Sequence, residues 1–427
     1  MSSPIHAAPS RRVYLHIGLP KTGTTSLQEM LWRNRGAAAA AGLLYPGYIE
    51  AAHGQAAMDL QRERYRDWLA PLVVGAWDRL VEHVRSWPAT SVISSELFAS
   101  ATPAQAQRAL AALSFAEVHL ICTARDLARQ IPSSWQENIK NGDSATFPEF
   151  LTALRTSESD AAGELFWGYQ DIPRILRNWR GNLPAERVHL ITVPQRGAPP
   201  TLLWQRFAAV LGIDPVSIPA RPSRNSSLGR AGTELLRRVN AELDGRLDWD
   251  RYAAVVKDQL AQDILITRSD PARITIPPAE QQWVAQRALR MIEEIRPTGY
   301  HVVGDLAELL PAELLPAELL PAELRPDRPL LAELTDPAEP TAIAATAEPS
   351  ESTVAEGPLL DIAVAALAEL VERISVLPPD APTAERIRHT LRTLSDQHPE
   401  LMALRRLYWK GKAQLSWSRP KTWHRLR

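Results

Sequence analysis

The segment VYLHIGLPKTGTTSLQ, residues 13–28, restricts the possible folds of this chain more than any other part of its sequence. Its apolar start predicts a buried strand that ends at Ile17, and a helix is expected from Thr25. Gly18 and Gly23 permit the tight path that turns successive backbone N–H groups toward one phosphate. The free amides and the positive dipole end of the helix favour an anion at the same point. The segment therefore predicts a phosphate-binding loop between a strand and a helix.

A lysine occupies the crest of this loop in a chain that has only six lysines. Lys21 supplies a cation there, and Thr22, Thr24 and Thr25 supply hydroxyl donors. The loop has the form G-x-x-x-x-G-K-[ST], except that Thr24 stands where that pattern has its lysine. ATPases and GTPases use the later lysine to reach the β- and γ-phosphates. Its displacement therefore argues against an ordinary enzyme of either class.

A second basic motif follows a later apolar run, in EVHLICTARDLARQIPSSWQENIK. Arg125 closes the run, and Ser133 lies eight residues further on, in a helix predicted over residues 127–139. A guanidinium can make a bidentate contact with a phosphate, which a helical hydroxyl can complete. The pair predicts a second phosphate contact.

PKTGTT after a strand resembles the 5′-phosphosulfate loop of the sulfotransferases that use 3′-phosphoadenosine 5′-phosphosulfate (PAPS). The Arg125–Ser133 pair resembles the family's 3′-phosphate signature. The resemblance covers residues 12–305 and implies a P-loop NTPase-like α/β fold, a parallel sheet flanked by helices. The residues that it implies for donor binding are Lys21, Thr22, Gly23, Thr24, Thr25 and Ser26 for the 5′-phosphate and sulfate, and Arg125 and Ser133 for the 3′-phosphate.

The resemblance is looser around residues 224–229, RNSSLG. This segment resembles the later part of bacterial sulfotransferase-like proteins and could close over the donor, as a basic Gly-containing loop does in the animal enzymes, but the Arg-Lys-Gly form of that loop is absent. Its role therefore stays open.

Sulfuryl transfer places two demands on the chain. A cation must stabilise the leaving oxygen, and Lys21 is the candidate. An alcohol acceptor also benefits from a base. Glu96 follows a predicted strand over residues 91–94, where open α/β sheets place ligands. His53 lies in a region where several sulfotransferase branches have a catalytic acid or base, so both candidates stay open.

Metal catalysis is not expected, because the histidines are scattered and Cys122, the single cysteine, lies in an apolar run. His16 is expected to be a buried, hydrogen-bonded histidine of the core. Lys140 is expected to complement the negative end of its helix, with contact to an anionic acceptor as the alternative.

The function implied is transfer of a sulfuryl group from PAPS to a hydroxyl or amine of a carbohydrate, glycolipid or small metabolite. One alternative is a P-loop kinase or other nucleotide phosphoryl transferase, with Mg²⁺ and Asp126 as its metal ligand. Another is a non-catalytic interaction protein that keeps the fold. The net charge of −1 argues against a general nucleic-acid binder.

The location expected is the cytoplasm of a bacterium. MSSPIHAAPS lacks the apolar core of a secretory signal, and no run reaches the roughly 18 apolar residues of a membrane span. Heavy use of Arg, Ala and Pro suggests a GC-rich bacterial genome.

Four regions are predicted along the 427 residues. Residues 1–11 form a disordered N-terminus, and 12–305 form the sulfotransferase domain. Residues 306–358 form a Pro/Ala/Glu-rich linker that opens with LAELL-PAELL-PAELL-PAELR, where proline prevents a continuous helix. Residues 359–427 form a helical region whose basic, Trp-containing end could contact an anionic membrane or polymer.

The predicted secondary structure alternates strands and helices, as a parallel sheet requires. Strands are predicted at 12–17, 91–94, 117–123 and 187–193. Helices are predicted at 25–34, 65–86, 103–113, 127–139, 169–179, 202–211, 231–243 and 279–295.

Overall fold

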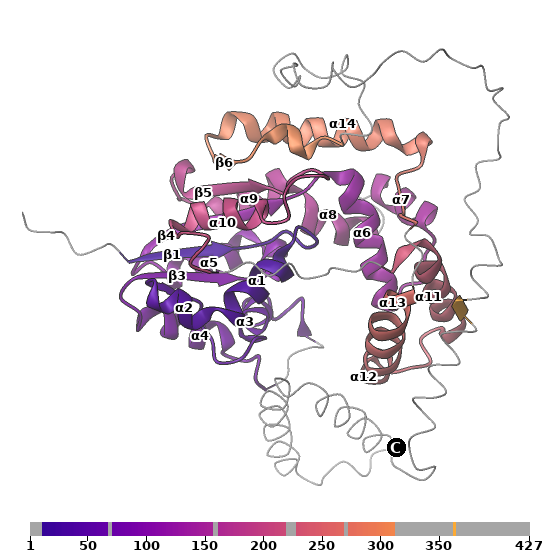
Figure 1. Ribbon diagram of the computed structural model, residues 1–427, viewed down its shortest axis with the longest axis horizontal. Coiled ribbons are helices and arrows are strands. Elements are labelled where there is room, and N and C mark those ends of the chain that lie inside the picture. The colour runs from indigo at the N-terminus through magenta and orange to yellow at the C-terminus, as the bar shows by residue number, and fades with distance from the viewer. Residues whose placement is uncertain are drawn as a thin grey trace, which may run out of the picture.

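Six parallel strands form the centre of the protein (Figure 1). The computed structural model describes residues 11–66, 71–156, 161–218, 228–268, 272–311 and 362–363. The strands are β1 (Arg12–His16), β2 (Leu43–Leu44), β3 (Thr90–Ser94), β4 (Glu117–Ala124), β5 (Val188–Thr192) and β6 (His301–Val303). They lie in the order β2-β3-β1-β4-β5-β6, which confirms the predicted α/β class with a parallel sheet flanked by helices.

The strand order reverses its direction at β1. The chain runs from β1 outward to β2, returns through β3, and then crosses to β4 on the other side of β1. Ligands of open α/β sheets bind outside the carboxyl ends of the strands at such a point. The phosphate loop, Glu96 and Arg125 follow β1, β3 and β4, so the topology brings all three to one edge.

Helices cover both faces of the sheet and are joined by short 3₁₀ turns. Those before β4 are α1 (Thr24–Arg33), α2 (Arg35–Ala40), α3 (Ala52–Leu60), α4 (Ala76–Arg85), η2 (Glu96–Ser100) and α5 (Pro103–Ala112). Those between β4 and β5 are α6 (Leu127–Lys140), α7 (Phe147–Arg155), α8 (Ala161–Gln170), α9 (Ile172–Arg180) and η3 (Ala185–Arg187).

The later helices include an uncommon π-type segment. They are α10 (Leu202–Leu211), α11 (Gly229–Leu243), α12 (Trp249–Arg251), the π-type helix η4 (Tyr252–Leu265), α13 (Ile266–Arg268), α14 (Pro278–Ile295), η5 (Arg296–Thr298) and η6 (Leu306–Leu309). In Figure 1, α11, α12 and α13 gather near α6, and α14 lies along the opposite side beside β6.

The alternation of side chains along the strands divides the core into two parts. Tyr14 and Ile121 face one side, where α1 and α10 contribute Leu31 and Phe207. The larger part contains alternate residues of the same strands, such as Leu15, together with α4, α5, α9 and α14. The sheet is therefore covered on both faces, as parallel sheets require.

Two predicted helices differ from the structure. The helix predicted over residues 65–86 is wrong before Ala76, because Gly75 adopts a left-handed φ of 75° and the described residues 71–75 form a turn. The helix predicted over 169–179 is interrupted at Asp171. Its carboxylate accepts a hydrogen bond from the amide of Arg174 and so begins a new helix, α9.

A row of histidines crosses the starts of β4, β5 and β6. His119 Nε2 lies 2.9 Å from Glu117 Oε1, His119 Nδ1 lies 2.9 Å from His189 Nε2, and His189 Nδ1 lies 2.8 Å from His301 Nδ1. Because the carboxylate accepts, each ring donates in turn to the one before it. Burial, with the neighbouring His119 and His301, lowers the pKa of His189 to about 4.

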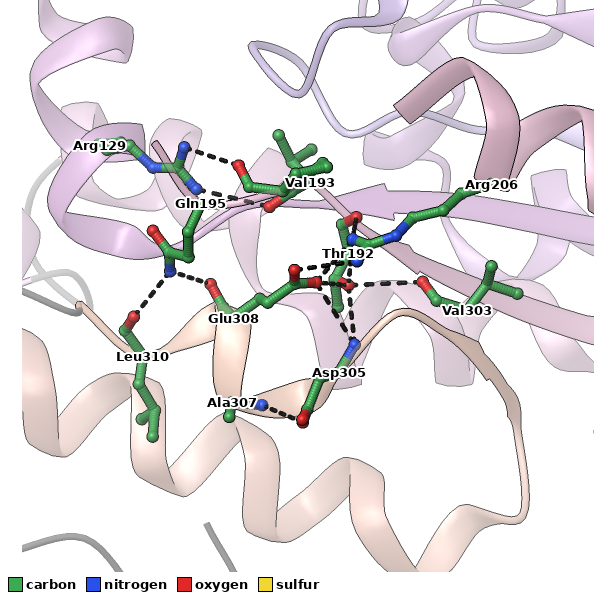
Figure 2. Close-up of polar contacts among 11 residues, drawn as sticks. Arg129, Thr192, Val193, Gln195, Arg206, Val303, Asp305, Ala307, Glu308 and Leu310 are labelled. Carbon is green, nitrogen blue, oxygen red and sulfur yellow. Dashed lines mark hydrogen bonds and ion pairs between the residues drawn. The ribbon is translucent and has the colours of Figure 1, made fainter. Parts of the chain in front are cut away.

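The predicted domain boundary at residue 305 lies too early. Glu308 of η6 accepts hydrogen bonds from Arg206 Nη1 at 2.6 Å and Nη2 at 2.9 Å, and also pairs with the hydroxyl of Thr192 (Figure 2). Gln195 Nε2 donates to the carbonyls of Glu308 and Leu310. Residues 306–311 therefore belong to the folded body, although their composition matches the linker.

The other predicted regions fall largely outside the described residues. These are residues 1–10, the rest of the repeat and linker, the 224–227 part of the polar loop, and the C-terminal region except 362–363. Residues 362 and 363 are helical, and Ile362 packs against the larger core. Within the described residues, no helix is long and apolar enough to cross a membrane.

Removal of the Glu308 carboxylate should destabilise the fold, because it leaves the Arg206 guanidinium, 15% exposed, without its counter-ion. We expect Glu308→Ala to lower the free energy of unfolding by about 2–3 kcal/mol, somewhat less than for a fully buried pair. Chemical denaturation measures this. Glu242→Ala is the matched control, because Glu242 is 88% exposed in its pair with Arg246 and should cost below about 1 kcal/mol. Equal losses would contradict the revised boundary.

Candidate active site

The loop after β1 presents a set of backbone amides without partners. Gly18 and Gly23 have φ values of 93° and 89°, and Lys21 has a left-handed φ of 65° although it is not glycine. None of the amides of residues 21–26 has an acceptor among the described residues, and Gly23 caps α1 without a side-chain bond. Such amides at a helix N-terminus favour an anion. The loop therefore has the glycine turns and the open amides at a helix start that the sequence predicted.

A buried chain of hydrogen bonds lies beneath the loop. Ser94 Oγ is 2.8 Å from His16 Nδ1, and His16 Nε2 is 3.2 Å from Thr123 Oγ1. Thr123 Oγ1 is 2.6 Å from Thr22 Oγ1, which donates to the carbonyl of Leu19 at 2.6 Å. This chain joins β3, β1, β4 and the loop, and it confirms His16 as a hydrogen-bonded core histidine.

The chain turns the Thr22 hydroxyl away from the loop surface. Thr22 is fully buried and Thr24 is 3% exposed, whereas Thr25 is exposed and Ser26 is half-buried. A phosphate in the loop would therefore meet the amide of Thr22 rather than its hydroxyl. Thr25 and Ser26 keep accessible side chains.

Glu96 lies directly against the loop. A Cβ atom on Gly18 would be 2.8 Å from the Cα of Glu96, so only glycine allows this approach. Gln28 Nε2 of α1 donates to Glu96 Oε2 at 2.9 Å and to Ser94 Oγ at 3.3 Å. The carboxylate is partly exposed at the carboxyl end of β3. This is where a base for an acceptor would be needed.

His53 has no ring nitrogen left for a substrate. The amide of Ser94 donates to His53 Nδ1 at 3.1 Å, so Nε2–H donates to the carbonyl of Pro46 at 2.7 Å. The ring is 2% exposed and stacks on Tyr45 at 4.2 Å between centroids. Burial lowers the pKa of His53 to about 4. Its contacts are those of a structural histidine, which leaves Glu96 as the better-placed candidate base.

Arg125 and the loop meet through one side chain of α6. Arg125 Nε donates to Gln130 Oε1 at 3.1 Å, and Gln130 Nε2 donates to the carbonyl of Pro20 at 2.6 Å. Arg125 Nη2 also donates to the carbonyl of Arg129 at 2.8 Å. Ser133 is half-buried one turn along α6 from Gln130. The structure therefore joins Arg125 to the loop through Gln130, and Ser133 lies on the same helix.

Positive charge gathers around Arg125. Burial, with the nearby guanidiniums of Arg129 and Arg196, lowers the pKa of Arg125 to about 10 against the opposing effect of Asp126. Arg125 thus remains a cation at neutral pH. Such a cluster of arginines is suited to a phosphate with two negative charges.

The cation of the loop is held by a carboxylate of α6. Lys21 Nζ pairs with Glu137 Oε2, and Lys140 Nζ lies 3.8 Å from the same oxygen. Although burial acts to raise it, Lys21 and Lys140 hold the pKa of Glu137 below its usual value. Glu137 therefore stays ionised and orients Lys21.

Gln28, Gln130 and Glu137 are site residues that the sequence motifs did not reveal. A signal exists for two of them, because Gln130, Ser133 and Glu137 recur at helical spacing and so share one face of α6. That face follows Arg125 and turns toward the loop. Gln28 lies inside α1 with no comparable pattern.

Two other features of the described residues lie outside this site. No group of three or more His, Cys, Asp or Glu side chains among them is arranged to hold a metal. A cleft of about 320 Å³ is lined by residues of α9, α14 and η5, among them Arg177 and Arg180, and by Tyr300 before β6. None of the predicted site residues lines this cleft.

Comparison with known proteins gives one structural likeness. No protein-family model matches the chain, and no curated protein sequence matches it. The crystal structure of a sulfotransferase from Alicyclobacillus acidocaldarius is similar with a TM-score of 0.36 and 16% identity, over 58% of this chain and 99% of that chain. So weak a likeness leaves the chemistry to be argued from the residues.

Acid should destabilise the protein through its buried histidines. The pKa is lowered by burial to about 3 for His16 and to about 4 for His53, and to about 4 for His189. The unfolded chain binds protons near pH 6.5, so stability present above that pH is lost as pH falls toward the folded values. We expect a slope approaching about 4 kcal/mol per pH unit for three protons between pH 6 and 4.5.

Chemical denaturation at a series of pH values measures this slope. His189→Gln should reduce it by about a third, because one titrating group is removed. Below pH 4.5 carboxylates such as Glu137 also contribute, so that range is excluded. A flat profile between pH 6.5 and 4.5 would show that these histidines bind protons as readily in the folded protein as in the unfolded chain.

Proposed function

We propose that the protein is a sulfotransferase that uses PAPS and transfers its sulfuryl group to a hydroxyl or amine of an acceptor. The observation that carries this proposal is Gln130, whose amide contacts both Arg125 and the loop at Pro20. The loop and Arg125, two separate candidate phosphate-binding features, are thus bridged by one side chain. A donor with a 5′-phosphosulfate and a 3′-phosphate would use both, whereas ATP would use one.

The residues of the site suit such a donor. The free amides of residues 22–26 would hold the 5′-phosphate, with Thr25 and Ser26 as hydroxyl donors. Arg125 and Ser133 would hold the 3′-phosphate. When bound, the donor supplies a sulfuryl group on a phosphate leaving group.

Lys21 and Glu96 would divide the remaining tasks. The ammonium of Lys21 would leave Glu137 or share it in order to neutralise charge on the leaving oxygen, and Lys140 would then keep Glu137 paired. The Glu96 carboxylate, with one oxygen fixed by Gln28, would accept the proton of the acceptor hydroxyl. Glu96 follows β3, whereas Glu137, the partner of Lys21, lies on α6 after β4, so the two carboxylates reach the loop from the two strands that neighbour β1.

The kinase alternative has less support. Asp126, its candidate metal ligand, is 2% exposed, caps α6 by accepting from the amide of Arg129 at 2.9 Å, and pairs with the Arg129 side chain. The contacts of the Asp126 carboxylate are therefore structural. A non-catalytic role would keep the same contacts but give no transfer from labelled donor to any acceptor.

Binding of adenosine 3′,5′-bisphosphate tests the donor assignment. We expect calorimetry to detect binding without Mg²⁺, and Arg125→Ala to weaken it by about ten- to a hundredfold, the worth of a charged hydrogen bond to phosphate. AMP, which lacks the 3′-phosphate, should bind the variant and the parent protein alike. An equal loss for both ligands would contradict the 3′-phosphate assignment, and tight binding of Mg·ATP would favour the kinase.

Substitution of Lys21 separates catalysis from folding. Lys21→Gly should lower transfer by at least about a hundredfold through loss of the cation. It should also keep or raise stability by up to about 1 kcal/mol, because glycine adopts the left-handed φ without strain. Asp244→Gly is the matched control, since Asp244 is the other described non-glycine residue with positive φ, at 42°. That variant should gain similar stability and keep full transfer.

The outcome for Lys21→Gly is read from both measurements together. Retained transfer would contradict the catalytic role of Lys21. Lost stability would show that the ion pair of Lys21 with Glu137 stabilises the fold, and does not serve only to orient the ammonium group.

A further inference from the structure

The turn after β5, residues 193–198 (the β5 turn), borders the donor site. Arg129 of α6 donates from Nη1 to the carbonyl of Pro194 at 3.0 Å and from Nη2 to the carbonyl of Val193 at 3.5 Å (Figure 2). Arg125, the candidate contact of the 3′-phosphate, donates from Nη2 to the backbone carbonyl of Arg129 at 2.8 Å. A shift of the β5 turn would therefore reach Arg125 through Arg129.

The β5 turn also carries a charge that acts on the donor site. Arg196 lies in this turn, and its guanidinium contributes to the lowered pKa of Arg125. The amide of Val193 donates to the carbonyl of Ala124 at 2.7 Å, so the turn begins beside the residue that precedes Arg125. Two neighbouring guanidiniums repel each other, whereas a doubly charged phosphate is attracted to both. The position of the turn therefore affects how tightly an anion binds at Arg125.

The sequence of the β5 turn makes it depend on side-chain contacts. The segment PQRGAPP, residues 194–200, contains three prolines, which lack an amide donor. Gly197 has a positive φ of 88°, which reverses the chain direction locally. The bond from the amide of Ala198 to the carbonyl of Gln195 is long, at 3.3 Å. Side chains that bind the turn from outside therefore contribute much of what fixes it.

Gln195 joins the β5 turn to the first unit of the repeat. That unit, LAELL at residues 306–310, contains η6. Gln195 Nε2 donates to the carbonyl of Glu308 at 2.7 Å and to that of Leu310 at 3.1 Å (Figure 2). The side-chain amide has two hydrogens, and this unit accepts both. Gln195 thus transmits the position of the unit to the turn.

The unit itself is anchored to β5 by contacts that do not involve Gln195. Glu308 accepts hydrogen bonds from both Nη atoms of Arg206 and pairs with the hydroxyl of Thr192. The amide of Asp305 donates to Thr192 Oγ1 at 3.2 Å. A Cβ atom on Gly304 would lie 2.0 Å from Thr192 Oγ1, so glycine is needed where the chain passes β5. The unit is therefore a fixed support for Gln195.

From these contacts we propose that residues 305–310 brace the donor site, with Gln195 as the positioning residue between this brace and the β5 turn. The proposal rests on the proposed function, because it takes Arg125 as a contact of the 3′-phosphate. The brace holds the β5 turn against Arg129 and keeps the charge of Arg196 near Arg125. Loosening the brace lowers the affinity for a ligand with a 3′-phosphate. The loop after β1 has its own contact with α6, so a ligand without that group binds as before.

Binding of adenosine 3′,5′-bisphosphate and of AMP to the full-length protein tests the brace. Gln195→Met approximately keeps the size of the side chain and removes its two hydrogen-bond donors. We expect this variant to bind the bisphosphate about three- to tenfold more weakly and AMP with unchanged affinity, since AMP lacks the 3′-phosphate. A role in stability alone would not change the ratio of the two affinities. Calorimetry measures both dissociation constants.

A second variant acts from the side of the brace. Glu308→Ala should weaken binding of the bisphosphate by a similar factor, and the double variant should lose little more, because both changes interrupt one path. Glu318→Ala is its control, since Glu318 has the same place in the third unit of the repeat. Gln281→Met is the control for Gln195→Met, because Gln281 of α14 donates to the carbonyl of Ile276 at 3.4 Å. Neither control should change either affinity.

Hydrogen exchange gives a measurement that needs no ligand. We expect the backbone amides of residues 193–198 to exchange at least about threefold faster in Gln195→Met, and those of β1 to exchange at the rate of the parent protein. Gln195 is only half-buried, so its variant remains informative if Glu308→Ala fails to fold.

The outcomes separate the brace from the donor assignment. Unchanged binding of the bisphosphate by Gln195→Met, or an equal loss for AMP, would overturn the brace and leave the donor assignment intact. A parent protein that does not bind the bisphosphate would overturn the donor assignment. Hydrogen exchange would then decide whether the brace holds the β5 turn, and an unchanged rate at residues 193–198 would overturn the brace as well.

Discussion

The buried hydrogen bonds from Ser94 through His16 and Thr123 to Thr22 fix the geometry on which the candidate site depends. The direction of these bonds follows from their last acceptor, the carbonyl of Leu19, which takes the proton of Thr22. Thr123 then donates to Thr22, His16 Nε2–H donates to Thr123, and Ser94 donates to His16 Nδ1. With this direction the ring is neutral, in agreement with its low pKa. A charged His16 would reverse the bond at Ser94, because Nδ1–H would then donate to the hydroxyl oxygen.

This chain couples three strand ends that carry different candidate site residues. Ser94 precedes Glu96, Thr22 belongs to the loop, and Thr123 precedes Arg125. A shift of one strand along its neighbours would break these bonds in addition to moving side chains to the wrong face. The loop, Arg125 and the candidate base Glu96 are thus held in register by buried side chains beneath them. Such buried networks favour one arrangement when every member has its partner.

Features that depend on neighbouring residues were predictable from the sequence, and those that depend on distant contacts were not. The phosphate loop and the strand before Arg125 are local patterns, and the structure has both. The break at Asp171 was not predictable because the apolar periodicity continues across it. The strand β2 was not predictable because it has only two residues. The pairing of Lys21 with Glu137 spans 116 residues, so no motif at either end could indicate it. Composition assigned residues 306–311 to the linker. They belong to the folded body because Glu308 forms an ion pair with Arg206, which a linker-like composition does not indicate.

The lysines of the described residues are Lys21, Lys140 and Lys257, and the choice of lysine rather than arginine at these positions has a chemical consequence. Arginine forms fixed, bidentate contacts, whereas an ammonium is a point charge that can exchange partners. Burial also lowers the pKa of Lys140, which increases the fraction of its reactive, uncharged amine at neutral pH. Within the described ranges, reagents that acylate or alkylate lysine side chains therefore have Lys21 and Lys140 at Glu137, and Lys257 at Asn141, as their targets. Covalent labelling of these amines becomes a direct measure of whether the site is occupied.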